Sequence, residues 1–153
     1  MIKAACMNAG SVPVPKAATL ARLAEKVMRA EGLHGQINLV FCENDYVRDL
    51  NRRFRKLDKV TDVLSFLYEE DDLFGEIYIA TTQAKMQAPR WENTFFEELR
   101  RLVVHGSLHL AGYDHMNAKD RKGMRAKEDL YLGLSKQLSL SNKKPSKAAK
   151  RGI

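Results

Sequence analysis

Apolar residues recur along the chain with two spacings, one typical of helices and one typical of strands. Three short apolar runs, at 37–42, 61–67 and 75–80, are predicted to be strands. The acidic segment 69–72 is predicted to be a solvated loop between the last two. Within residues 15–31 apolar side chains return every three or four positions, as on the buried face of an amphipathic helix: Leu20, Leu23, Ala24, Val27 and Met28.

Three further helices are predicted from capping residues and apolar periodicity. Asn44, Thr94 and Asn117 can each cap the start of a helix. The second of these helices is apolar nearly all round over residues 102–110, which is typical of a buried helix, and Gly112 ends it. The inner faces are expected to carry Val47, Leu50 and Phe54 in the first helix, Phe95, Phe96 and Leu99 in the second, and Met124, Tyr131, Leu134 and Leu138 in the third.

This order of elements predicts the α+β class, with a small sheet covered by helices. A chain of 153 residues has the usual size of one domain and can bury one sizeable core. We expect the domain to span residues 1–140, followed by a separate tail at 141–153.

The positive charge of the chain is concentrated in that tail. The formal net charge is +7, and residues 141–153 contribute five cations and no acid, so residues 1–140 carry only +2. We expect the tail to be disordered. It serves either as a solubilising extension or as a nonspecific contact to nucleic acid.

No part of the sequence predicts secretion or membrane insertion. No apolar run approaches the roughly 18 residues that a membrane helix needs, and the N-terminus lacks the apolar core of a signal peptide. Cys6 and Cys42 fall in apolar segments without CxxC spacing, so they are predicted to be buried free thiols. We therefore expect a cytoplasmic protein that does not bind membranes.

Three of the four histidines lie in the stretch HGSLHLAGYDH. His105 and His109 are one helical turn apart, so they project from the same face of the predicted helix. His115 can return to them after the turn at Gly112. This spacing supplies three neutral nitrogen ligands and no obvious fourth, the pattern of a catalytic metal site with an open position. A structural site completed by Asp114 or a cysteine, and hydrogen-bonded core histidines without a metal, are the alternatives.

The same histidine spacing occurs in metzincin proteases, where a glutamate follows the first histidine and acts as general base. The corresponding residue here is Gly106, which cannot accept a proton, so a peptidase is disfavoured. Three neutral imidazoles also leave the +2 charge of a divalent ion uncompensated, which suits an anionic substrate.

A second segment of the chain favours a phosphate-bearing substrate. The planar guanidinium of arginine can donate to two phosphate oxygens at once. A solvated basic helix end, where cations meet the helix dipole favourably, is the alternative. Within residues 50–66 five cations cluster where a helix is predicted to run into a strand: Arg52, Arg53, Arg55, Lys56 and Lys59.

HGSLHLAGYDH, together with NRRFRKLDKVTDVLSF and GEIYIA upstream, resembles the YbeY endoribonucleases, bacterial factors for rRNA maturation and ribosome quality control. The family signature H-G-x-L-H-L-x-G-Y-D-H is matched at every specified position, and the motifs cover residues 37–116. Val60 and Leu67 stand where the family usually has proline, which affects the outline of the cleft and not the metal site.

The resemblance implies a particular cofactor and set of site residues. The cofactor is zinc, one ion per chain, although other divalent transition metals also bind such nitrogen sites. The implied residues are His105, His109 and His115 as metal ligands and Arg55 as the catalytic residue, and the cation cluster adds Arg52, Lys56 and Lys59 as expected RNA contacts.

The implied function is that of a single-strand-specific, metal-dependent endoribonuclease acting on the 3′ end of small-subunit rRNA and in ribosome quality control. The implied partners are RNA, the small ribosomal subunit and assembly factors, and we expect a monomer. The implied fold is a small mixed four-stranded sheet covered by about five helices. The alternatives are a ribosome-assembly binding protein with a structural metal and, disfavoured by Gly106, a zinc peptidase.

Overall fold

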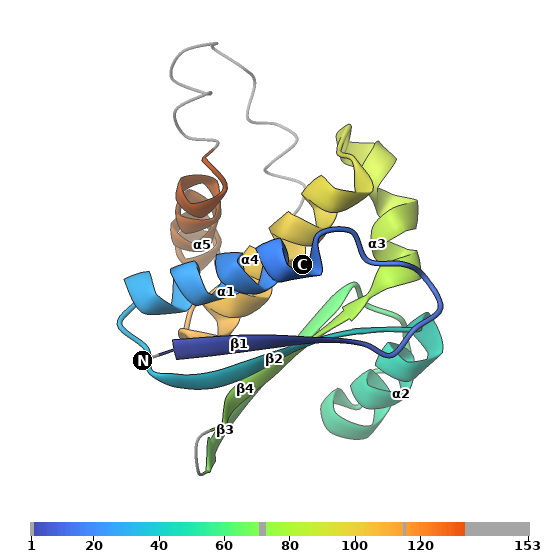
Figure 1. Ribbon diagram of the computed structural model, residues 1–153, viewed down its shortest axis with the longest axis horizontal. Helices are drawn as coiled ribbons and strands as arrows, with labels where there is room; N and C mark the ends of the chain where they lie inside the picture. The colour runs from blue at the N-terminus through green and yellow to red at the C-terminus, as the bar shows by residue number, and fades with distance from the viewer. Residues whose placement is uncertain (1, 71–72, 115, 134–153) are drawn as a thin grey trace.

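A mixed four-stranded sheet forms the centre of the structure, a computed structural model that describes residues 2–70, 73–114 and 116–133 (Figure 1). Its strand order is β1-β2-β4-β3, in which β1, β2 and β4 are parallel and β3 pairs antiparallel with β4. This arrangement confirms the predicted α+β class and the mixed sheet. The strands are β1 (Ile2–Asn8), β2 (Gly35–Cys42), β3 (Val63–Glu70) and β4 (Leu73–Ala80).

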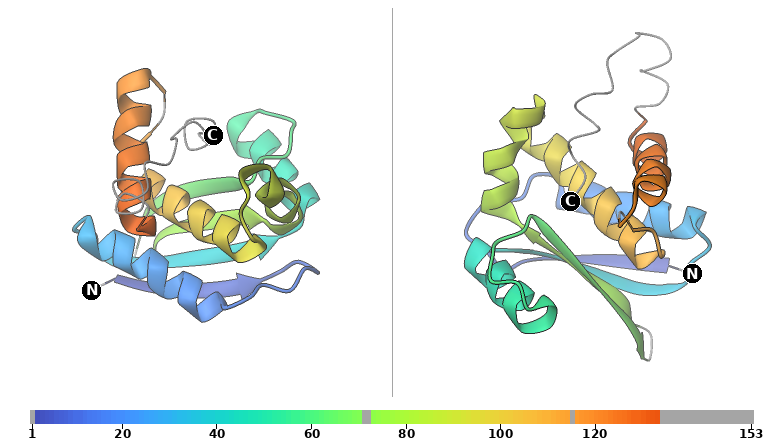
Figure 2. Two further views of the ribbon diagram at one scale, coloured as in Figure 1. Left: turned by 90° about the horizontal axis from the view of Figure 1, so that it is seen from above. Right: turned by 180° about the vertical axis from the view of Figure 1, so that it is seen from behind.

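Five α-helices surround the sheet, as predicted. Figures 1 and 2 show α1, α4 and α5 on one side of the sheet and α2 on the other. Within the described part of the chain, no helix combines the length and the apolar character that crossing a membrane requires. The helices are α1 (Ala17–Ala30), α2 (Asn44–Arg55), α3 (Thr81–Gln87), α4 (Phe95–Leu110) and α5 (Ala118–Leu132), and a short 3-10 helix, η1 (Ala88–Trp91), joins α3 to α4.

The alternation of side chains along the strands produces two unequal cores. The larger core lies between the sheet and helices α1 and α4, and β2 contributes Ile37, Leu39 and Phe41 to it. The smaller core lies under α2, where β2 contributes Val40 and Cys42. Helix α4 is buried on almost every side from Arg101 to Leu108, which confirms the prediction of a central buried helix.

Two side chains predicted to be buried are exposed. Phe54 is 59% exposed, because the inward position in the last turns of α2 is taken by Asn51. The Phe54 ring instead rests edge-on against Phe66, with centroids 5.6 Å apart. Cys6 is exposed because β1 is an edge strand, and its thiol donates to the carbonyl of Ala17 at the start of α1. Cys42 is buried as predicted, and burial raises the pKa of its thiol to about 12.

Several elements lie where the apolar pattern did not predict them. Strand β1 and helix α3 have no clear apolar periodicity, and β3 and β4 extend into the acidic segment that was predicted to be a loop. Helix α5 ends at Gly133, which has a φ of 77°. Leu134, Leu138 and the predicted tail at 141–153 lie outside the described residues.

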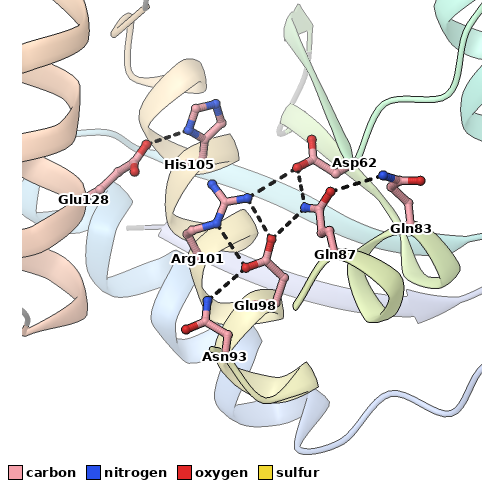
Figure 3. A network of polar contacts seen from close by, with 8 residues as sticks. All are labelled: Asp62, Gln83, Gln87, Asn93, Glu98, Arg101, His105 and Glu128. Carbon is pink, nitrogen blue, oxygen red and sulfur yellow. Dashed lines mark hydrogen bonds and ion pairs between the residues drawn. The ribbon is translucent and has the colours of Figure 1, made fainter. Parts of the chain in front are cut away.

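A buried ionic cluster connects α4 to β3 and α3 (Figure 3). The Arg101 guanidinium donates to Glu98 at 2.8 Å and lies 3.4 Å from Asp62, which directly precedes β3. The Gln87 amide donates to both carboxylates, at 2.7 and 2.8 Å. Although burial opposes it, hydrogen bonding to Glu98 raises the pKa of Arg101, so the guanidinium remains cationic. The cluster therefore holds the end of α3 and the start of β3 against α4.

The substitution Arg101→Leu tests this cluster. It leaves two carboxylates buried without their cation, so we expect the free energy of unfolding to fall by about 3–5 kcal/mol in urea denaturation. Arg100→Leu is the matched control, because this neighbour is partly exposed and its loss should change stability by no more than about 0.5 kcal/mol. Equal effects of the two substitutions would contradict a structural role for the cluster.

Candidate functional site

A cavity of about 430 Å³ lies between the end of α2, strand β3 and helix α4. Its lining brings together His105 and His109 from α4, Arg55 from α2 and Lys59 from the loop before β3. The histidine motif and the cation cluster, which are far apart in the sequence, therefore meet in one hollow. This is the candidate site.

The two histidines are held by a helix with a well-defined start. Thr94 and Glu97 form a capping box, in which each side chain bonds to the backbone N–H of the other residue. His105 is 2% exposed, and its ring lies 4.7 Å from that of His109, centroid to centroid, with the planes nearly perpendicular. The Nδ1 of His105 also lies 2.6 Å from the carboxylate of Glu128 on α5 (Figure 3). Both rings line the cavity from one face of α4.

Arg55, the last residue of α2, reaches across to β3. Its guanidinium donates to the backbone carbonyl of Ser65 at 2.9 Å and lies 5.4 Å from the centre of the Phe66 ring. Lys56 ends the helix in the left-handed conformation, with a φ of 58°, which turns the chain away. The side chain of Arg55 is therefore oriented by a backbone acceptor and an aromatic ring at the rim of the cavity.

The other predicted RNA contacts divide between two places. Lys59 lines the cavity, and the loop that carries it is held by the buried Asn51, whose amide donates to the Lys59 carbonyl at 3.0 Å. Arg52 instead forms an ion pair with Asp49 and faces a separate hollow whose lining mixes aspartates and arginines. Lys56 is exposed and does not belong to the lining of the cavity. The structure thus brings Lys59, and neither Arg52 nor Lys56, to the histidines.

Leu67 also lines the cavity, and it is 51% exposed. This is one of the two positions where the YbeY pattern usually has proline. The departure from that pattern therefore changes a wall of the cavity and leaves the histidine helix as it is.

Gly106 packs directly against the sheet. A Cβ atom at this position would lie 2.7 Å from Cγ2 of Ile77 and 3.1 Å from Oγ of Ser65, and the Ser65 hydroxyl donates to the Gly106 carbonyl at 3.0 Å. A glutamate in this place, as in metzincins, has no room. The peptidase alternative is therefore disfavoured by packing as well as by the chemistry of the missing base.

The donor set of the cavity is compatible with a metal ion. Within the residues that the structure describes, no group of three or more His, Cys, Asp or Glu side chains is placed to hold a metal. His105 and His109 are described, whereas His115 lies outside the described residues. Two neighbouring imidazoles, one of which bonds to a carboxylate through its second nitrogen, are nevertheless the usual chemistry of a zinc site.

Sequence reasoning missed three residues that shape this site: Asn51, Ser65 and Glu128. Asn51 lies on a strongly polar helix, where its burial has no sequence signal. Ser65 and Glu128 contact α4 across 41 and 23 residues of chain, respectively. No local spacing indicates either contact, because each depends on how whole elements pack.

Comparisons with known proteins find relatives that match most of the chain. The family model "Endoribonuclease YbeY" matches residues 10–135. The chain is 39% identical over 137 residues to the Endoribonuclease YbeY of Pelotomaculum thermopropionicum, covering 81% of this chain and 90% of the relative. It is 40% identical over 126 residues to that of Desulforamulus reducens, covering 72% and 82%. It is also similar to the solution structure of TM1509 from Thermotoga maritima, with a TM-score of 0.61, 33% identity and coverage of 100% and 99%.

Two glycine substitutions test the packing of α4 against the sheet. Gly106→Ala should destabilise the protein by about 1–2 kcal/mol, because the clash with Ile77 exceeds the gain in helix propensity. Gly123→Ala, in α5, meets nothing within 4 Å and should stabilise it by about 0.5–1 kcal/mol. Thermal and urea denaturation measure both effects. The same sign for both substitutions would contradict the close approach at Gly106.

Proposed function

This chain belongs to the YbeY endoribonuclease family, and we propose that it cleaves single-stranded RNA with the help of a divalent metal ion. Family membership supports a hydrolase whose substrate is RNA. The observation that carries the proposal is the cavity in which His105 and His109 meet Arg55 and Lys59. Nitrogen ligands and cations that face one hollow suit a phosphodiester bound beside a metal.

His105, His109 and, from the same motif, His115 would hold the metal. Three imidazole nitrogens favour zinc, one ion per chain, although nickel or copper can compete for such ligands. A bound divalent ion would supply Lewis acidity to a phosphate oxygen or to a water molecule. The contact of His105 Nδ1 with Glu128 supports this assignment, because histidine ligands of metals usually donate their other ring nitrogen to a carboxylate.

Arg55 would bind the phosphate that is cleaved. A guanidinium carries five N–H donors, and the contact with the Ser65 carbonyl uses only one side of this fork. The remaining donors of an exposed side chain can reach the nonbridging oxygens, where negative charge develops during the reaction. Lys59 would add positive charge at the same rim and hold the RNA backbone in the cavity.

We place this activity in the maturation of the 3′ end of small-subunit rRNA and in ribosome quality control. The support is the family resemblance of the motifs, which also implies the small ribosomal subunit and assembly factors as partners. The chain would act in the cytoplasm as a monomer, with Arg52, Lys56 and the basic tail at 141–153 as further contacts to RNA.

A ribosome-assembly binding protein with a structural metal is the second candidate. It is favoured by the contact of His105 with Glu128, because a metal at this histidine would also stabilise the packing of α4 against α5. Assays of RNA cleavage and of ribosome binding, made on the same variants, separate the two candidates.

Metal analysis of protein purified without a histidine tag tests the ligands. We expect about one zinc ion per chain, because three protein ligands with an open fourth position are the pattern of a catalytic zinc site. His109→Ala should abolish binding, whereas His34→Ala, at an exposed position in the loop between α1 and β2, should leave the zinc content unchanged. Full occupancy in the His109→Ala protein would show that this histidine is not a ligand.

Substitution of Arg55 tests the catalytic assignment. Arg55→Ala should lower the rate of RNA cleavage by about 10²-fold or more while zinc content stays intact, because one preorganised donor to the phosphate is lost. Arg55→Lys should recover only part of the rate, since an ammonium cannot donate to two oxygens in the same geometry. Arg48→Ala is the control, because Arg48 pairs with Asp58 at the separate hollow lined by aspartates and arginines. An unchanged rate for Arg55→Ala would exclude Arg55 from catalysis.

A further inference from the structure

We infer that Glu128 is a positioning residue for His105, which makes helix α5 part of the metal site. This inference rests on the proposed function, because it assigns to Glu128 a role toward the metal that His105 would bind. Glu128 lies 23 residues beyond His105 and outside the histidine motif. Its role follows from the contact between α4 and α5.

The contact between the two residues is short and shielded from water. The Nδ1 of His105 lies 2.6 Å from Oε2 of Glu128, and the two side chains are 2% and 13% exposed. Hydrogen bonds to an ionised carboxylate are shorter and stronger than neutral ones, and burial strengthens them further. This contact can therefore fix the orientation of the imidazole.

The chemistry of the contact determines which nitrogen of His105 can bind a metal. An ionised carboxylate can only accept a hydrogen bond, so Nδ1 carries the proton and donates it to Glu128. The lone pair of the neutral ring is then on Nε2, and a metal ligand needs an unprotonated nitrogen. A carboxylate behind a histidine ligand also increases the basicity of the ring. Glu128 thus prepares His105 for coordination before any metal binds.

Helix α5 is anchored so that Glu128 stays in place. Met124, one turn earlier, is buried in the main core. On the neighbouring face, Lys127 forms an ion pair with Glu31 at 3.3 Å, and the Tyr131 hydroxyl donates to the same carboxylate. The Tyr113 hydroxyl, from the connection between α4 and α5, donates to Glu31 at 3.0 Å. The end of α1 therefore holds α5 independently of the histidine.

A second buried charged group lies near Glu128, the Arg101 guanidinium one helical turn before His105. Figure 3 shows its direct partners, the carboxylates of Glu98 and Asp62. Burial opposes the charge of Arg101, whereas hydrogen bonding to Glu98 and the charges of Glu98, Asp62 and Glu128 together raise its pKa. The buried cluster on α4 therefore keeps its own cation, and Glu128 contacts His105.

Zinc affinity of the full chain, measured by competition with a chromophoric chelator, tests the inference. Glu128→Ala should weaken zinc binding by about 10- to 100-fold, the usual effect of losing such an outer carboxylate. Glu128→Gln keeps an acceptor oxygen without the charge and should lie between Glu128→Ala and the unmodified chain. Lys127→Ala is the matched control, because it loosens α5 from Glu31 without touching His105. It should lower the melting temperature and leave zinc affinity unchanged.

Nitrogen-15 NMR of the metal-free chain provides a second measurement that does not depend on metal. His105 should carry its proton on Nδ1 in the unmodified protein and in Lys127→Ala. In Glu128→Ala the acceptor is lost, so the ring should no longer be restricted to the tautomer with the proton on Nδ1. If Glu128→Ala does not fold, as seen by circular dichroism, Glu128→Gln carries the comparison of zinc affinity, because it keeps the hydrogen-bond acceptor and loses only the charge.

Two results would overturn the inference: zinc affinity unchanged in both Glu128 variants, or an equal loss of affinity in Lys127→Ala, which would assign the effect to the docking of α5. Failure of the proposed metal site has a different signature. In that case the unmodified chain binds no stoichiometric zinc, while the NMR measurement still reports whether Glu128 fixes the protonated nitrogen of His105.

Discussion

The close approach of α4 to the sheet at Gly106 is the constraint on which the rest of the structure depends. No side chain separates the helix from Ile77 and Ser65 at this point, and the Ser65 hydroxyl bonds to the helix backbone. The distance between helix and sheet in turn determines how far His105 and His109 stand from β3, and therefore the width of the cavity. Within the histidine motif, Gly106 allows the helix to pack against the sheet, whereas His105 and His109 line the cavity.

Helix α4 buries four polar or charged side chains, and successive turns use them differently. In the first turns, Glu98 and Arg101 satisfy each other and connect the helix to Asp62 and Gln87. One turn later, the polar side chains are imidazoles that face a cavity. The ionic cluster stabilises the helix and the start of β3, so that the histidines are presented by a rigid element. Positioning of this kind favours precise coordination geometry.

The side chains of the candidate site are held in place in two different ways. The histidines are held within a buried helix, whereas Arg55 stands at the exposed end of α2 and is directed by a carbonyl and the Phe66 ring. This division suits the proposed metal-dependent nuclease, in which the metal ligands would keep their geometry while a cation at the rim meets a flexible substrate. Helix α5 contributes Glu128, whose carboxylate contacts Nδ1 of His105.

The sequence by itself determined the features that depend on residues close to one another along the chain. The pair His105 and His109 falls on one face of α4 because the two residues are four positions apart, and Thr94 caps the start of that helix as its sequence context predicts. The tertiary structure decided the rest. The edge strand β1 forms because it pairs with β2, Asn51 takes the inward position instead of Phe54 because it can bond to the loop at Lys59, and Glu128 reaches His105 because α5 folds back over α4. Contacts between residues 23 to 41 positions apart leave no spacing in the sequence, since only the packing of whole elements brings them together.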